Sequence, residues 1–182
     1  MKIIYLAAGR AKLNHENVVY NDIKEKRDLK GDMMRVPLEN FDILIATPPC
    51  NYYSRANNRR ESSIYALQTK NLLPNIIEKF IKTGKPFIVE NVRNDPLFKA
   101  LNLYNFPCFV YKHGRHTYWT NVLINFSNIP QTYDFKQIKG YGCIRLKSYV
   151  QGGKNVNDVF DYFLEIVKNN NFKNLWRKNE TI

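Results

Sequence analysis

Residues 41–50 read FDILIATPPC, and residues 71–91 read NLLPNIIEKFIKTGKPFIVEN. Each segment contains a short apolar run, at 41–47 and at 86–89, with the length and composition of a buried strand. Between the runs, apolar residues recur at the spacing of one helix face: Leu73, Ile76, Ile77, Phe80 and Ile81. Gly84 stands where a C-cap glycine belongs. A helix between two buried strands is a βαβ unit, which predicts parallel pairing and an α/β domain.

The remaining chain extends this pattern in both directions. Two further apolar runs, at 2–8 and 18–20, precede the βαβ unit, and the charged segment 24–30 is predicted to be an exposed loop. The aromatic and β-branched segment 106–126 predicts two more strands. Helical spacing returns at 156–167, which predicts a last helix.

Composition limits the classes of protein that this chain can belong to. The 182 residues fit one domain over 1–182, ending in a basic polar tail at about 169–182. Apolar residues make up 44% and exclude wholesale disorder, while no apolar run is long enough for a membrane span or a signal peptide. The three cysteines form no CxxC pair, so we expect no metal site and a reduced, cytoplasmic location. A net charge of +12 indicates a polyanionic partner, of which nucleic acid is the commonest, or else a solvated lysine-rich surface.

Polar residues stand at the predicted strand ends, where ligands bind in open α/β sheets. Pro48 and Pro49 stiffen the chain before Cys50, which a basic environment would activate as a nucleophile. Glu90 and Asn91 end the next predicted strand, and a carboxylate there is costly unless it is paired or protonated for use. The alternatives are a small buried cysteine and a surface carboxylate.

The order of these residues resembles that of the DNA cytosine-5 methyltransferase family. Pro-Pro-Cys at 48–50 is followed about forty residues later by Glu-Asn-Val at 90–92, and then by Arg-His-Thr at 115–117. The resemblance is closest to short phage- and prophage-type members, in which Pro-Pro-Cys precedes an aromatic–Ser pair. It implies a minimal Rossmann-like class I S-adenosylmethionine-dependent methyltransferase fold. It also implies methylation of phage DNA in a bacterial host cell, as protection against restriction.

The resemblance implies a covalent mechanism with four catalytic residues. Cys50 would attack C6 of cytosine and so make C5 reactive. Glu90 would hold N3 and the exocyclic amine and supply a proton to N3. Asn91 would position the loop, and Arg115 would orient the base or stabilise charge near its O2. The family's Arg-x-Arg step reads Arg-His-Thr here, so His116 would have to compensate, or else Thr117.

The resemblance also implies a cofactor site and a DNA-binding surface. The cofactor, S-adenosylmethionine, would contact Ala8, Gly9, Asp22, Asp32, Pro48 and Asn155, with the two aspartates on the ribose and the adenine. The residues predicted to bind DNA are Tyr52, Tyr53, Ser54, Arg55, Arg59, Arg60, His116 and Thr117. The arginines would grip phosphates and the tyrosines would stack in the place of the flipped base. A solvated loop is the alternative reading of residues 52–60.

The chain departs from the family pattern in two spacings. Only about a dozen residues separate Gly9 from Asp22, too few for a loop, a full helix and a strand. About 33 residues separate Arg-His-Thr from Gln151, which leaves no room for a separate target-recognition domain. Sequence specificity would then be loose or supplied by a partner protein. Two other functions stay open: a non-catalytic protein that binds DNA or a host protein, and a methyltransferase acting on a nucleotide or RNA.

Overall fold

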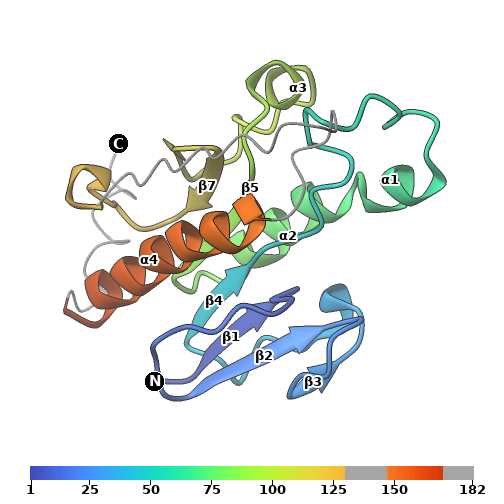
Figure 1. The fold of residues 1–182 in the computed structure, drawn as a ribbon. Helices are drawn as coiled ribbons and strands as arrows, with labels where there is room; N and C mark the ends of the chain where they lie inside the picture. The colour runs from blue at the N-terminus through green and yellow to red at the C-terminus, as the bar shows by residue number, and fades with distance from the viewer. Residues whose placement is uncertain (130–146, 170–182) are drawn as a thin grey trace.

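The computed structural model describes residues 1–129 and 147–169. Its strands are β1 (Ile3–Leu6), β2 (Val18–Asp22), β3 (Leu29–Lys30), β4 (Ile43–Ala46), β5 (Phe87–Val92), β6 (Phe109–His113) and β7 (His116–Thr120). Its helices are α1 (Ile64–Thr69), α2 (Leu72–Ile81), α3 (Asp95–Ala100) and α4 (Lys147–Asn169), with 3-10 turns η1 (Met33–Arg35) and η2 (Phe126–Asn128). The predicted α/β class is confirmed (Figure 1).

One sheet joins all seven strands in the order β3-β2-β1-β4-β5-β7-β6. Both pairings of β7 are antiparallel, and the other pairings are parallel. Without β7 this is the Rossmann order, with a reversal between β1 and β4. In such sheets ligands bind beyond the carboxyl ends of the strands at the reversal, so the fold directs attention to the segments after β1 and β4.

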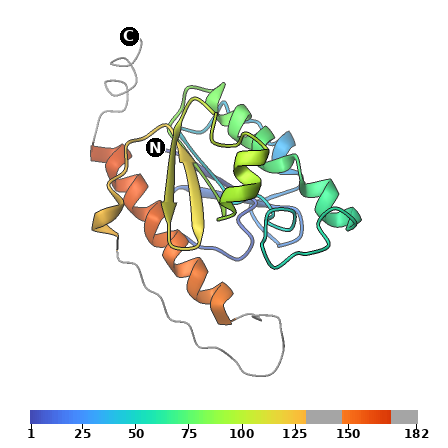
Figure 2. The ribbon, with the colours of Figure 1, turned by 90° about the horizontal axis from the view of Figure 1, so that it is seen from above.

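Apolar strands bury both faces of the sheet, and helices cover both faces. On one face, α2 packs its buried side chains Leu73, Ile76, Ile77 and Phe80 against the strands. On the other face, α4 contributes Val159, Phe160, Phe163 and Leu164 to a second core. Figures 1 and 2 show α4 alone on its side, with α1, α2 and α3 on the opposite side.

The predicted βαβ unit is confirmed in detail. β4 and β5 pair in parallel, and α2 connects them over the predicted apolar face. Gly84 ends this connection with φ +64, a left-handed conformation that favours glycine. The two strands predicted within 106–126 are β6 and β7, which form a hairpin around Gly114.

Several elements differ from the predictions. The connection from β1 to β2 contains no helix, as its length predicts, but the segment 24–30 contributes β3 where an exposed loop was expected. The last helix, predicted from the apolar spacing at 156–167, begins earlier, at Lys147. α1 and α3 were not predicted at all. The predicted basic tail lies outside the described residues, apart from its first residue.

Candidate active site

The segment that carries Cys50 is anchored from two neighbouring strands. Thr47 follows β4 and donates its hydroxyl hydrogen bond to the carbonyl of Ala7, at 2.9 Å. Asn91, buried in β5, donates from Nδ2 to the carbonyl of Pro48, at 3.0 Å. The two prolines add backbone stiffness. Cys50 is therefore presented at a defined position beyond the sheet, and Asn91 contacts the segment that it was predicted to position.

Cys50 itself is half-buried and begins a tight turn. Its carbonyl accepts hydrogen bonds from the backbone N–H groups of Tyr53 and Ser54, at 3.0 and 2.8 Å. Burial, and secondarily the negative charge of Glu90, raise the pKa of its thiol above the ordinary value. The expectation that a basic environment lowers this pKa is therefore wrong for the free protein, because burial is the main influence and the charge that adds to it is that of a carboxylate.

Glu90 lies on the α4 face of β5 and is only 8% exposed. Its carboxylate Oε1 lies 2.5 Å from Nδ1 of His116, at the start of β7. Tyr118 stands directly opposite Glu90 in the register, and its buried hydroxyl has no hydrogen-bond partner within the described part of the chain. Arg115 is exposed at the tip of the β6–β7 turn, beside His116. The structure thus brings Cys50, Glu90 and the start of β7 to one edge of the sheet.

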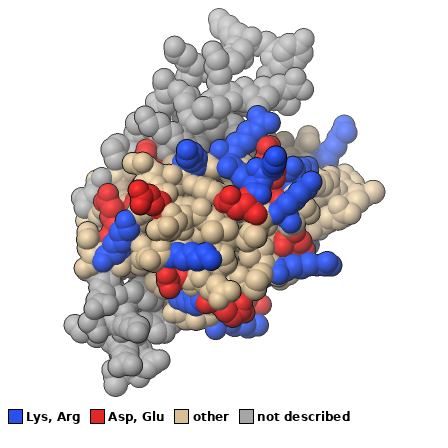
Figure 3. Space-filling model, turned by 90° about the horizontal axis from the view of Figure 1, so that it is seen from below, with Lys and Arg blue, Asp and Glu red and all other residues tan. Residues whose placement is uncertain are grey.

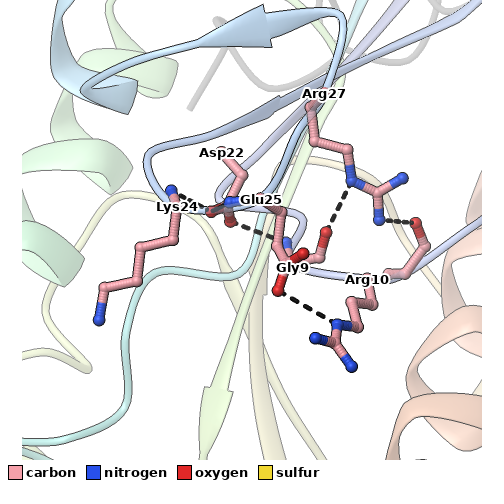
Figure 4. Close-up of polar contacts among 7 residues, drawn as sticks. Gly9, Arg10, Asp22, Lys24, Glu25 and Arg27 are labelled. Atoms are coloured by element: carbon pink, nitrogen blue, oxygen red, sulfur yellow. Dashed lines mark hydrogen bonds and ion pairs between the residues drawn. The ribbon is translucent and has the colours of Figure 1, made fainter.

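Asp22 ends β2 and accepts three backbone hydrogen bonds (Figure 4). Its Oδ2 accepts from Gly9 at 2.9 Å, and its Oδ1 accepts from Lys24 and Glu25 at 2.8 and 3.0 Å. Burial would raise the pKa of this carboxyl, but the backbone donors and the charge of Arg27 outweigh it, so that the pKa is lowered. Asp22 is therefore a fixed, ionised acceptor beside the segment that follows β1.

The loop after β1 is held by a residue that the sequence did not single out. Arg27 donates from Nε to the carbonyl of Gly9 at 2.7 Å, and from Nη2 to the carbonyl of Ala11 at 2.9 Å. Arg10 pairs with Glu25 at 3.1 Å on the surface (Figure 4). A short loop without a following helix is thus fixed by a guanidinium. In the sequence, Arg27 is distinguished only by its position in the charged segment 24–30.

The residues around β1 and β2 have the chemistry of a nucleoside-binding site. A Cβ built on Gly9, which has φ +54, would meet no atom within 4 Å, so the space beside this residue is open. Asp22 offers carboxylate oxygens of the kind that ribose hydroxyls bind. Asp32 is exposed, and one of its oxygens caps η1 by accepting from Met34 N–H at 2.9 Å. Ala8, next to Gly9, and Pro48, in the segment after β4, are both buried. The side chain of Asn155 lies outside the described residues.

The structure places Tyr52 and Tyr53 in the core, although we predicted that they contact DNA. They are 2% and 0% exposed, and their hydroxyls donate to Glu61 and to the carbonyl of Lys70. Thr117 is likewise fully buried in β7. These placements contradict base stacking by the two tyrosines and contact of Thr117 with DNA in this conformation. The error arose because an aromatic residue in a polar segment looks exposed in sequence.

The three arginines that follow Cys50, which were predicted to bind DNA, have two different environments. Arg60 donates from Nη2 to the carbonyl of Ser54 at 3.0 Å and from Nε to the carbonyl of Asn57 at 3.2 Å, so that it holds the loop. Arg55 and Arg59 are exposed. Ser54 is half-buried and accepts from Ala56 N–H at 3.3 Å. Arg55 and Arg59 are therefore the members of the cluster that are free to reach phosphates.

Residues 10–102, just over half of the chain, match the family model of the C-5 cytosine-specific DNA methylases. The chain belongs to this family. The match includes Cys50, Glu90 and Asn91 and ends before the β6–β7 hairpin. Membership of the C-5 cytosine-specific DNA methylases makes the chain a DNA (cytosine-5-)methyltransferase and makes DNA its partner. A search among curated proteins finds no match to this methylase. None of its described helices is long and apolar enough to cross a membrane.

Proposed function

We propose that this methylase transfers a methyl group from S-adenosylmethionine to C5 of cytosine in DNA through a transient covalent bond to Cys50. The observation that carries the proposal is the hydrogen bond from Asn91 to the carbonyl of Pro48. It couples the strand that holds Glu90 to the segment that presents Cys50, so that a nucleophile and a proton source face one base. Because burial and the charge of Glu90 raise the pKa of the thiol, Cys50 would need activation when the base binds.

The chemistry requires both groups because C5 of cytosine is a weak nucleophile. The thiolate of Cys50 would bond to C6 while Glu90 supplies a proton to N3, so that the ring becomes an enamine. S-adenosylmethionine supplies an electrophilic methyl group, which C5 accepts. Loss of the C5 proton to a base then re-forms the double bond and releases Cys50. Arg115, at the tip of the hairpin, would stabilise charge near the base O2.

The proposed cofactor site lies at the carboxyl ends of β1 and β2. Gly9 provides open space, and the ionised Asp22 would accept hydrogen bonds from the ribose hydroxyls. Asp32 would accept from the adenine amine, while Ala8, Pro48 and Asn155 would border the ligand. The reversal of strand order between β1 and β4 supports this location, because dinucleotides and related ligands bind at such points.

The proposed DNA-binding surface follows Cys50 along the chain. Ser54, Arg55 and Arg59 would contact phosphates on either side of a base that has left the stack. The net charge of +12 supports such a contact, and Figure 3 shows lysine and arginine side chains gathered on one side of the face in view. Arg60 would act indirectly, by holding the loop that presents them.

The proposal is tested by methyl transfer and adduct formation on the same DNA. Wild type should transfer tritiated methyl groups from S-adenosylmethionine to cytosine-containing DNA. With DNA carrying 5-fluorocytosine, the C5 proton that must leave is replaced by fluorine, so the adduct should persist and survive denaturing electrophoresis. Cys50→Ala should abolish both signals, and Cys108→Ala is the matched control that should preserve them. Methyl transfer by Cys50→Ala would refute the mechanism, and an inert wild type that still binds DNA would favour a non-catalytic binding protein.

The biological role that we propose is protection of phage DNA from restriction. A cytosine methylated at C5 presents an extra methyl group in the major groove, where restriction endonucleases read bases. DNA treated with the protein and S-adenosylmethionine should therefore resist cleavage by endonucleases whose sites contain cytosine. Comparison of single-stranded DNA, duplex DNA and RNA as methyl acceptors would identify the substrate class.

A further inference from the structure

We infer that His116 shares a proton with Glu90 and supplies it for protonation of cytosine N3. This inference rests on the proposed function and assigns to His116 a positioning and proton-supplying role in place of direct DNA contact. Glu90 touches the base, and His116 acts through Glu90. The observation is the 2.5 Å contact between His116 Nδ1 and Glu90 Oε1, at a place where both side chains are largely removed from solvent.

The contact itself requires a proton between the two atoms. A carboxylate oxygen only accepts hydrogen bonds, and a bare imidazole nitrogen also only accepts. Two acceptors at 2.5 Å would repel one another, so either Nδ1 donates to the carboxylate or the carboxylic acid donates to Nδ1. Either way, one proton lies between Nδ1 and Oε1. Where Nε2 of His116 also carries a proton, the pair holds one proton more than an ionised Glu90 beside a neutral imidazole, and this extra proton can pass to a base through Glu90.

The geometry of the sheet maintains this contact. β5 and β7 pair antiparallel with Val92 opposite His116 and Glu90 opposite Tyr118, so that Glu90 and His116 are diagonal neighbours. Alternation of side chains along the strands places both on one face. The side-chain exposure is 18% for His116 and 10% for Glu90, so solvent competes weakly for the shared proton.

Few other titratable groups of the described chain face the pair. Cys50 approaches from the segment after β4 and interacts with Glu90, and Tyr118 does so from β7. Tyr5 of β1 lies near Tyr118, and His113 of β6 stands opposite His116 in the register. Arg115 precedes His116 on the hairpin. From α4, Phe160 packs edge-on against Tyr5 and Tyr118, so that the described part of this helix presents an apolar side chain here.

The proton leaves the pair and returns to it within one reaction cycle. As the Cys50 thiolate bonds to C6, the proton moves from the pair to N3 through Glu90 Oε, leaving Glu90 ionised and His116 neutral. When the C5 proton leaves and Cys50 departs, N3 returns its proton to Glu90, and the pair is restored. His116 neither gains nor loses a proton over a full cycle. An arginine could not play this part, because its guanidinium remains protonated.

The test compares adduct formation on 5-fluorocytosine DNA as a function of pH for wild type and His116→Asn. Asparagine retains an N–H donor near the position of Nδ1 but cannot titrate. We expect the ratio of wild-type to variant rate to grow with pH, approaching about tenfold per pH unit where Glu90 alone can no longer hold the proton. The control His15→Asn, beside Lys168 on α4, should match wild type at every pH. A ratio that is constant with pH would overturn the inference, since a purely structural role predicts it.

A spectroscopic measurement separates this inference from the proposed function. In protein labelled with ¹⁵N-histidine, the proton of His116 Nδ1 should resonate far downfield, as short charge-assisted hydrogen bonds do. Glu90→Gln should return it to the ordinary range without moving the signals of His15. A signal of His116 that ignores Glu90→Gln would refute the shared proton even if methyl transfer proceeds. Absence of any adduct in wild type would instead refute the proposed function, and the histidine spectrum would still report on the pair.

Discussion

The environment of Cys50 in the free protein opposes the reactive form of its thiol. Cys50 is half-buried, and its burial, together with the charge of Glu90, raises the pKa of the thiol. Thiolate is the reactive form of cysteine, so we expect the proposed nucleophile to react slowly in the free protein. Binding of the base would weaken the second influence, because a hydrogen bond between a protonated Glu90 and N3 of the base removes the negative charge beside the thiol.

The raised pKa of the Cys50 thiol predicts how fast this residue reacts with alkylating agents. The rate with iodoacetamide should be low at neutral pH and rise through a pH above the ordinary thiol range of about 8.5 to 9. Glu90→Gln removes the negative charge that raises the pKa, so it should increase the rate severalfold at a fixed pH near 8. Peptide mass spectrometry can follow Cys50 and use Cys108, whose pKa burial raises to about 11, as the internal comparison. An equal rate in wild type and variant would contradict the assigned influence of Glu90.

Cys50, Glu90 and Asn91 could be proposed as site residues from the sequence, because unusual polar residues follow the strands there in an order that resembles a known family. Their environments could not be predicted. The ion pair of Glu90 with His116 depends on the register of β5 and β7, which a sequence does not display. The burial of Tyr52 was equally hidden, because it depends on the turn that follows Cys50 and on the packing of α1.

Among the elements, long periodic segments were predictable and short ones were not. α2 combines a regular apolar face with a glycine at its end, so sequence alone identifies it. α1 has only six residues and exposes Ile64, Tyr65 and Leu67, so its apolar pattern does not mark a buried face. β3 has two residues and exists because β2 offers an edge to pair with. Such elements depend on tertiary contacts more than on local pattern.

The loop after β1 is held by the side chain of Arg27 and is not followed by a helix. In place of a helix, two hydrogen bonds from Arg27 to loop carbonyls hold the segment Gly9–Ala11. We expect Arg27→Ala to weaken binding of S-adenosylmethionine about tenfold, equivalent to ~1.4 kcal/mol, with the fold retained. Isothermal titration calorimetry measures this, and Arg10→Ala is the matched control because Arg10 makes only a surface ion pair. Equal affinities of the two variants would show that the loop does not depend on Arg27.

The start of α3 is joined to β6 through Asp95. Burial would raise the pKa of Asp95, but hydrogen bonds from Tyr104, Arg93 and Lys112 outweigh it and lower the pKa to about 2. A carboxyl with a lowered pKa stabilises the fold above its unfolded pKa of about 4, and this contribution is lost as the pH falls through the folded value. Wild type should therefore be more stable to urea than Asp95→Asn at pH 7, and the difference should shrink between pH 4 and pH 2.

The variant Tyr104→Phe serves as the comparison for Asp95→Asn. It removes one hydrogen bond to Asp95 but leaves both charged partners, Arg93 and Lys112, in place. It should lose a smaller part of the stability at pH 7 than Asp95→Asn and retain a dependence on acid pH. A stability difference between wild type and Asp95→Asn that is independent of pH would contradict the role of the ionised carboxylate.

The candidate site residues that the structure describes lie at the carboxyl ends of the parallel strands, and none of them lies at the amino ends. The segments after β1, β2 and β4 and the end of β5 all lie at the carboxyl edge of the parallel strands. Lys2, before β1, and Lys82, at the end of α2, lie at the amino edge, because a helix of a βαβ unit runs back across the sheet. Positive charge is present at both edges, so the direction of DNA binding can be tested by removing charges from each edge separately.

Affinity for duplex DNA should fall steeply with salt concentration, since phosphate contacts release counterions. Arg55 and Arg59 are exposed beside Cys50, so the double substitution Arg55→Ala with Arg59→Ala should reduce the slope of log K against log salt by about 2, or about 1 per phosphate contact. The pair Lys2→Ala with Lys82→Ala removes the same charge from the amino edge and should leave the slope near that of wild type. Fluorescence anisotropy at several salt concentrations measures all three proteins. If both double variants reduced the slope equally, DNA affinity would depend only on net charge. The edge that carries Cys50 would then make no specific contribution to DNA binding.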